Sequence, residues 1–178
     1  MSQVNSIKIP GKRVFGTEPF MCTANVQMCV QTMGGRAVFG WSIHHDHYTV
    51  AKVNHCVWED QSGQLWDVTP QFAAIEGEMA IIEWPKETEF ERDDAAVFEG
   101  KAHPTRHVPA HPSPHVARAC EFMERADVFL FQDDLERCRY WTERANKEMA
   151  KAKLPVRWDT PVSTSMKDVL ATVVPNKP

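Results

Sequence analysis

The sequence predicts an α+β fold, in which one helix packs on an antiparallel sheet of about four strands and a C-terminal helical hairpin follows. Three observations lead to this prediction. Apolar residues recur at helical spacing between residues 19 and 33. Alternate residues share a face on both sides of a turn between residues 50 and 70. Helical spacing returns between residues 116 and 153.

The first helix is expected from Pro19 to Met33. Proline is favoured in the first turn, where its missing N–H costs nothing, and Gly34 is suited to end the helix. One helical stripe contains Cys22, Val26, Cys29 and Met33. Cys22 would lie in the first turn, where free backbone N–H groups and the positive end of the helix dipole favour a thiolate. Cys29 lies deeper in the helix and is the weaker candidate for a nucleophile.

The strand predictions rest on short apolar or alternating runs. A short strand is expected at residues 4–9, a longer one at Arg36–Ile43, and another at Met79–Trp84. Residues 44–47 (His-His-Asp-His) form a polar turn. The charged stretch 86–94 is interpreted as a loop or a short helix.

The central element is a β-hairpin over residues 50–70, with a glycine-containing loop. One register places Trp58 directly opposite Trp66 as an aromatic cross-strand pair. The same register places His55 and Asp67 on one face, one diagonal apart, about 7–8 Å between backbones. A slip by one residue would destroy both pairs.

The C-terminal half is expected to differ from the first 100 residues. Four histidines recur every four residues (His103, His107, His111 and His115), but the interleaved prolines forbid a helix there. Residues 101–115 are therefore interpreted as a semi-extended linker. Helices are expected at 116–125 and 132–153.

Four segments follow from these patterns. Residues 1–100 form the α+β core, 101–115 the linker, 116–154 the helical hairpin, and 155–178 a poorly ordered, proline-containing tail. A chain of 178 residues is long enough to bury a core without disulfides.

Composition excludes several classes of partner. The net charge of −4 gives no electrostatic reason to expect nucleic acid or an anionic membrane. No apolar run approaches 18 residues and no secretory signal is visible, so a cytoplasmic protein is expected. The five cysteines follow no CxxC pattern, which argues against a disulfide framework or a structural zinc site.

Several short segments occur in an informative order. They are Cys22 near a helix start, Gly35-Arg36-Ala37-Val38-Phe39-Gly40, His55 with Trp58 and Glu59, and Trp66-Asp67-Val68-Thr69-Pro70. In this order they resemble the transglutaminase-like superfamily, over about residues 17–70. That resemblance implies a papain-like core, with a cysteine on a helix and a histidine and an aspartate on neighbouring strands.

The resemblance implies three catalytic roles. Cys22 would be the nucleophile, His55 the general base, and Asp67 the residue that orients the imidazole. The substrate would be a protein, a peptide or a small molecule with an amide, ester or thioester bond, and it would pass through an acyl-enzyme. The alternatives of peptidase, amidase and transglutaminase or other acyltransferase stay open. No cofactor is implied by a covalent thiol mechanism.

Three further residues are candidates for substrate binding. Asn25, one turn beyond Cys22, could join the Cys22 N–H as a donor to the oxyanion. Trp58 and Trp66 could stack on substrate, although a packing pair explains them as well.

Two other classes of function compete with the enzyme. Residues 44–47 and His55 offer imidazole and carboxylate ligands for a metal, although no HExxH or CxxC motif accompanies them. A degenerate papain-like core could instead serve as an interaction or inhibitor protein, with a protein partner docked on the helical hairpin 116–153.

Overall fold

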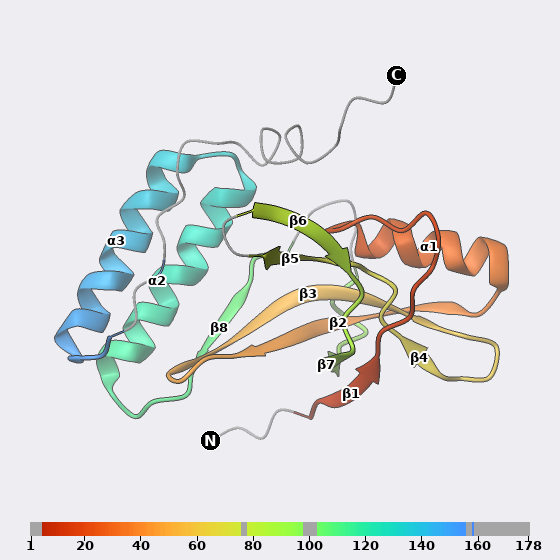
Figure 1. The fold of residues 1–178 in the computed structure, drawn as a ribbon. Coiled ribbons are helices and arrows are strands. Elements are labelled where there is room, and N and C mark those ends of the chain that lie inside the picture. Colours follow the sequence, from red (N-terminus) through yellow and green to blue (C-terminus); the bar gives the residue numbers. More distant parts are fainter. Residues whose placement is uncertain (1–4, 76–77, 98–102, 156–157, 159–178) are drawn as a thin grey trace. The chain divides into compact units, whose positions relative to one another are not determined.

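The computed structural model describes residues 5–75, 78–97, 103–155 and 158. The chain forms two compact units, residues 1–45 with 51–103, and residues 46–50 with 104–178 (Figure 1). The elements are β1 (Ile7–Pro10), α1 (Cys22–Met33), β2 (Arg36–His45), β3 (Thr49–Glu59), β4 (Leu65–Trp66), β5 (Gln71–Ile75), β6 (Glu78–Glu83), β7 (Glu87–Arg92), β8 (Arg106–Pro109), α2 (Pro114–Phe131) and α3 (Leu135–Lys151).

The fold is α+β, as predicted, but the main sheet has six strands rather than about four. Its order is β1-β7-β2-β3-β4, and β8 also pairs with β3. The strand expected at Met79–Trp84 is present as β6, yet it pairs with β5 in a separate two-stranded sheet.

Strand β7 replaces the loop or short helix expected at residues 86–94. Thr88 and Phe90 are buried, while Glu87, Glu89 and Glu91, which alternate with them, are exposed or half-buried, so the segment alternates as a strand should. The many charged residues obscured this two-residue alternation in the sequence. The glutamates are neutralised locally, since Glu87 pairs with Lys8 at 2.7 Å and Glu91 pairs with Lys52.

The predicted register of the central hairpin is confirmed where the structure pairs it. Trp58 is the partner of Trp66, and Glu59 is the partner of Leu65. The second strand is shorter than expected, because Asp67 leaves β3 and forms a parallel bridge with Gly11. The Asp67 N–H donates to the Pro10 carbonyl at 3.0 Å, and the Asp67 carbonyl accepts from the Lys12 N–H at 2.8 Å.

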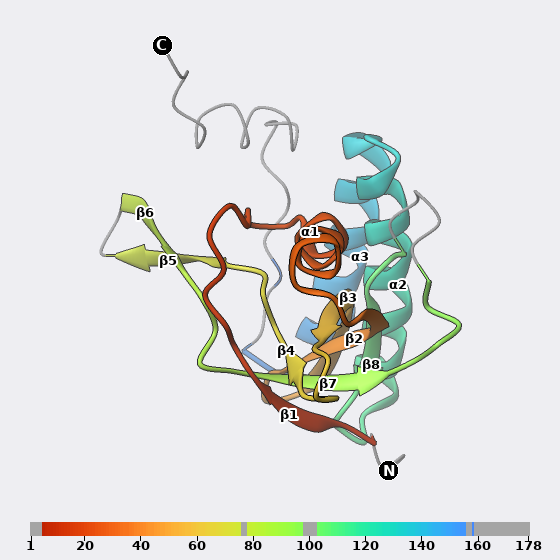
Figure 2. The ribbon, with the colours of Figure 1, turned by 90° about the vertical axis from the view of Figure 1, so that its right-hand side faces the viewer.

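Two apolar clusters flank β3 in the first unit. Cys56 and Trp58 pack against Val26 and Cys29 of α1, which Figure 2 shows nearly end-on. Val57 belongs to the other cluster, and its neighbours there are Ile9, Val38, Phe90 and Leu65. Adjacent residues of β3 therefore bury opposite sides of the strand, as the alternation in the sequence predicted.

Helix α1 begins three residues later than predicted. Phe20 has a φ of 62°, which a helix cannot include, and Met21 is the N-cap residue. Pro19 therefore lies before the helix. The C-terminal end is as expected, because the Gly34 N–H donates to the Val30 carbonyl at 3.0 Å.

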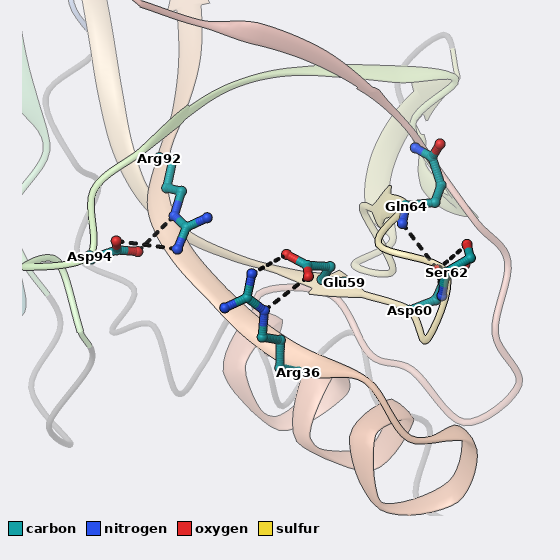
Figure 3. A network of polar contacts seen from close by, with 7 residues as sticks. All are labelled: Arg36, Glu59, Asp60, Ser62, Gln64, Arg92 and Asp94. Carbon is teal, nitrogen blue, oxygen red and sulfur yellow. Dashed lines mark hydrogen bonds and ion pairs between the residues drawn. The ribbon is translucent and has the colours of Figure 1, made fainter.

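The turn between β3 and β4 is organised by the Asp60 carboxylate (Figure 3). It accepts hydrogen bonds from the Ser62 N–H and hydroxyl, the Gln64 N–H and the Trp66 ring N–H. The bonds from Ser62 and Trp66 contribute most to holding the pKa of Asp60 at about 2. Beside this turn, Arg36 makes two hydrogen bonds to Glu59, of 2.9 and 2.8 Å. The loop is thus fixed in place, and with it the hairpin register.

The second unit contains an antiparallel pair of helices, α2 and α3 (Figure 1). Ser113 caps α2 and Asp134 caps α3, each accepting a backbone N–H. Their shared core is Val116, Ala119, Cys120, Met123, Ala145 and Met149. Helix α2 extends to Phe131, beyond the predicted end at 125, and β8 occupies part of the segment expected to be a linker. Residues 159–178, which cover most of the predicted tail, lie outside the described residues.

No helix in the described ranges is long and apolar enough to cross a membrane.

Gly40 allows β7 to lie against β2, so its replacement should destabilise the first unit. A Cβ at Gly40 would overlap the Glu91 carbonyl oxygen and lie 2.7 Å from the Phe90 ring. We expect Gly40→Ala to lower the free energy of unfolding by about 2 kcal/mol or more in urea titrations. Gly63→Ala is the control. It has a φ of 83° and nothing within 4 Å, so strain alone should cost about 1 kcal/mol. An equal loss in both variants would contradict the packing argument.

Candidate functional site

Cys22 is the first residue of α1 and is half-buried. No side chain caps this helix, and the first backbone bond of the helical type runs from the Asn25 N–H to the Met21 carbonyl at 2.8 Å. The N–H groups of the preceding residues have no acceptor within the helix. The thiol therefore lies where a negative charge is stabilised by the helix dipole.

His55 and Asp67 form a close ion pair. The His55 Nε2 atom lies 3.0 Å from Asp67 Oδ2, with 12 % of the His55 side chain exposed and 1 % of the Asp67 side chain. The ring N–H is not well aligned with the carboxylate, so Nε2 does not meet the angular requirement of a hydrogen bond. Distance rather than angle governs the attraction between opposite charges, and the contact is therefore best described as an ion pair. The sequence predicted that these two residues lie close together, although Asp67 reaches His55 after it has left the hairpin and joined Gly11.

Asp67 is completely buried, and its remaining acceptor capacity is used. The Thr88 hydroxyl donates to Oδ2 at 2.7 Å, and the Thr69 N–H donates to Oδ1 at 3.0 Å. Thr88 lies in β7, within the charged stretch that gave no strand signal, so nothing in the sequence pointed to it. These bonds fix the carboxylate in front of His55.

Cys22 and His55 interact with one another, because each shifts the pKa of the other. Because Nε2 faces Asp67, Nδ1 is the ring nitrogen left for the thiol. The Cys56 backbone N–H also donates to the Cys22 sulfur, and the Thr23 hydroxyl lies 4.0 Å from it. Burial alone would raise the pKa of Cys22, but His55 and these two donors together hold it below its ordinary value.

The pKa of His55 moves in the opposite direction. Burial alone would lower it, yet the Asp67 carboxylate and the Cys22 thiolate raise it to about 10. Burial would likewise raise the pKa of Asp67, but the interaction with His55 and the bonds from Thr88 and Thr69 lower it. The imidazole and the carboxylate are therefore charged near neutral pH, and the lowered pKa of Cys22 favours its thiolate form.

The other cysteines are in the opposite situation. Burial raises the pKa of Cys29 and Cys138, and it raises the pKa of Cys56 and Cys120 to about 12. Cys29, the weaker candidate for a nucleophile, lies on α1 and is fully buried against Cys56 and Trp58 of β3. Cys22 is thus the one cysteine with a lowered pKa among five.

Asn25 does not have the environment expected of an oxyanion donor. It is 4 % exposed, its Nδ2 donates to the Glu18 carbonyl at 2.7 Å, and its Oδ1 accepts the Glu18 N–H at 2.9 Å. Both ends of the amide are committed to one residue of the preceding loop. Asn25 therefore holds that loop against α1, which argues against the predicted contact with substrate.

The two tryptophans are packing residues. Trp58 is 3 % exposed, and its ring N–H donates to the Gly34 carbonyl at 2.9 Å. Trp66 is half-buried, and its ring N–H is bonded to Asp60. The Lys12 ammonium lies 4.6 Å from one ring centroid and 4.8 Å from the other. Because Trp58 is buried and the Lys12 ammonium lies over its ring, Trp58 has no open face on which substrate could stack. This argues against the stacking role considered from the sequence.

The histidines considered as metal ligands are engaged elsewhere. His44 is bonded to Ser42 at 3.1 Å, and His45 pairs with Glu89 at 2.9 Å. Asp46 accepts backbone N–H groups in its own turn. Across the part of the chain that the structure describes, no group of three or more His, Cys, Asp or Glu residues is placed to hold a metal ion.

Comparison of the chain with family models, curated proteins and solved structures finds no match.

The raised pKa of His55 predicts a pH-dependent contribution to stability. Between the ordinary pKa of about 6.5 and the folded value of about 10, the native state binds more protons than the unfolded state. The contribution is therefore complete below pH 6.5, falls as the pH rises, and is lost above about 10. We expect His55→Gln to lose on the order of 3 kcal/mol at pH 6 and much less at pH 10, measured by urea unfolding at each pH.

The control for this experiment is His47→Gln, because His47 is an exposed histidine in the turn before β3. Its unfolding free energy should run parallel to that of the wild type across the same range. A constant difference between His55→Gln and the wild type at every pH would contradict the ion pair.

Proposed function

We propose that this protein is a cysteine-nucleophile acyl-transfer enzyme with a papain-like arrangement of Cys22, His55 and Asp67. The observation that carries the proposal is the convergence of these three side chains from a helix start, a central strand and a segment beyond the hairpin. The inverted pKa values of Cys22 and His55 add to it, because perturbed titration is typical of catalytic pairs. The order of the residues in the sequence resembles that of the transglutaminase-like superfamily.

The chemistry follows from the charge state of the three groups. The Cys22 thiolate attacks the carbonyl carbon of an amide, ester or thioester, and the electron pair of the carbonyl moves to its oxygen. The backbone N–H of Cys22 has no acceptor within the helix and is suited to bind that oxyanion. The His55 imidazolium then donates its proton to the leaving group, and an acyl-enzyme with a thioester bond remains.

Release of the acyl group reverses these roles. Neutral His55 accepts a proton from water or from an amine, whose oxygen or nitrogen attacks the thioester. The thiolate leaves, and the ion pair with His55 re-forms. Asp67 stays charged throughout and fixes the imidazole orientation through Nε2. Water as the acceptor would make the protein a peptidase or amidase, and an amine would make it a transferase. The mechanism needs no cofactor, and we propose a cytoplasmic site of action.

The first test is selective alkylation. We expect iodoacetamide at pH 7 to modify Cys22 at least tenfold faster than any other cysteine, because its thiolate fraction is the highest. Peptide mapping by mass spectrometry gives the rate at each site. His55→Ala should slow the reaction at Cys22 about tenfold or more, and Asp67→Asn should slow it by less.

The matched control is Cys29→Ser, on the same helix stripe, which should leave the rate at Cys22 unchanged. Equal and slow modification of all five cysteines would contradict the catalytic proposal.

A second candidate function is recognition of an acidic segment of a partner protein by the helical hairpin. Its evidence is a cluster of aromatic and arginine side chains on α2 and α3. The guanidinium of Arg125 lies 4.8 Å from the Trp141 ring centroid, and that of Arg144 lies 5.5 Å from it. Tyr140, 51 % exposed, packs edge-on against Trp141 with centroids 5.2 Å apart.

These arginines differ from others in the protein. Arg36, Arg92 and Arg137 each bind a carboxylate. Within the described residues, neither Arg125 nor Arg144 has a carboxylate partner, so charge complementarity favours an anionic ligand. Trp141 is half-buried, while Tyr140 and both arginines are exposed, and these three residue types are enriched in binding hot spots.

This surface predicts binding that is independent of Cys22. A fluorescein-labelled decapeptide of alternating glutamate and leucine should bind the protein, and the double variant Arg125→Gln/Arg144→Gln should bind at least about fivefold more weakly by fluorescence anisotropy. Lys147→Gln, also exposed on α3, and Cys22→Ser should bind as the wild type does. No binding, or preferential binding of labelled oligothymidylate, would contradict this candidate.

A further inference from the structure

The segment that leads into the nucleophile, residues 14–21, is held at several points. Val14 packs against the core cluster under α1. The Thr17 hydroxyl donates to the Val14 carbonyl at 2.9 Å and closes a tight turn. The Asn25 amide binds both the carbonyl and the N–H of Glu18, at 2.7 and 2.9 Å. The path of the backbone from this clamp to Cys22 is therefore short and fixed.

Two large apolar side chains stand between the clamp and the nucleophile. Phe20 is 61 % exposed and Met21 is 49 % exposed. Phe20 also has a φ of 62°, a conformation that is strained for a bulky residue and that glycine adopts without strain. The aromatic side chain of Phe20 is thus present at a position where the backbone would favour a residue without one.

Both residues are close neighbours of the nucleophile along the chain. Two residues of extended chain span at most about 7 Å, so the Phe20 Cα lies no farther than that from the Cys22 Cα, and Met21 is adjacent. A carbonyl carbon bound to the Cys22 sulfur would place a group a few bonds away beside these residues. Neither side chain carries a charge or a hydrogen-bonding group that could recognise a polar substituent.

We propose that Phe20 and Met21 form an apolar shelf that selects acyl substrates with an apolar group beside the reactive carbonyl. This inference rests on the proposed function of Cys22 and names the class of its substrate. Burial of an apolar substituent against the shelf would stabilise the complex and hold the carbonyl near the thiolate. Asn25 is then a positioning residue, because its two bonds to Glu18 fix the backbone that presents the shelf.

The test compares two alkylating probes at Cys22. One is chloroacetamide, and the other is N-phenethyl-chloroacetamide, which carries an apolar group beside the same reacting centre. The rate of each is divided by its rate with free N-acetylcysteine, and the site is verified by peptide mapping. In the wild type we expect this normalised rate to be at least about tenfold higher for the apolar probe than for chloroacetamide. A chloroacetamide with a carboxyethyl substituent should have the same normalised rate as chloroacetamide itself.

Variants of the shelf should remove this gain. Phe20→Gly removes the ring and relieves the backbone strain, so it tests the shelf without a folding penalty. The ratio between the probes should fall toward one, and Met21→Ser should lower it as well. Asn25→Ala should lower the ratio through a displaced loop. Phe15→Ala, at a fully exposed phenylalanine earlier in the segment, and Phe131→Ala on α2 are the matched controls and should keep the wild-type ratio.

The outcomes separate this inference from the proposal on which it rests. Slow reaction of Cys22 with chloroacetamide itself would contradict the activated thiol. Fast reaction with a ratio near one, or a ratio that Phe20→Gly leaves unchanged, would overturn the shelf alone. An equal loss of the gain in Phe15→Ala would also overturn it, because the effect would then not depend on proximity to Cys22.

Discussion

The first unit is built around a buried negative charge, that of Asp67. A carboxylate without solvent is costly unless it is paired and hydrogen-bonded. Asp67 meets both conditions through His55, Thr88 and Thr69, and its backbone is tied to β1 through Pro10. Four separate segments of the chain are thereby brought to one point. The same charge raises the pKa of His55, and His55 in turn lowers the pKa of Cys22. The packing of these segments and the pKa values of both residues thus depend on one ion pair.

This dependence accounts for the selectivity among the cysteines. Cys22 and Cys56 lie close enough for the Cys56 N–H to bind the Cys22 sulfur, yet their pKa values move apart. Burial dominates at Cys56, where no cation opposes it. At Cys22 burial acts in the same direction but is outweighed by the imidazolium and by donated hydrogen bonds. Proximity to the histidine, rather than burial or exposure, therefore decides which thiol has a lowered pKa.

The sequence was sufficient to predict that His55 and Asp67 lie close together. It was not sufficient to predict the roles of Thr88 and Asn25, which hold the surrounding segments in place. The alternation around the hairpin predicted that Trp58 meets Trp66 and that His55 lies near Asp67, because a strand repeats every two residues and a slip would expose the core. Thr88 could not be found this way, because the glutamates of its strand obscure the strand pattern in the sequence. The lysines that pair with these glutamates are close in space but far away in the sequence. Asn25 was misassigned for a similar reason. Its partner, Glu18, lies in a loop whose path no periodicity describes.

The late start of α1 has a chemical consequence that connects the strain at Phe20 with the thiol. Had the helix begun at Pro19, Cys22 would occupy a later position in the first turn and its N–H would approach the helical bonding pattern. Because Phe20 has a left-handed backbone conformation, the helix cannot include it, and the helix begins at Cys22. The sulfur then lies at the positive end of the dipole, beside donors that no helical carbonyl uses. Under the proposed function, the strained backbone at Phe20 would therefore act through the position that it gives to the Cys22 thiol.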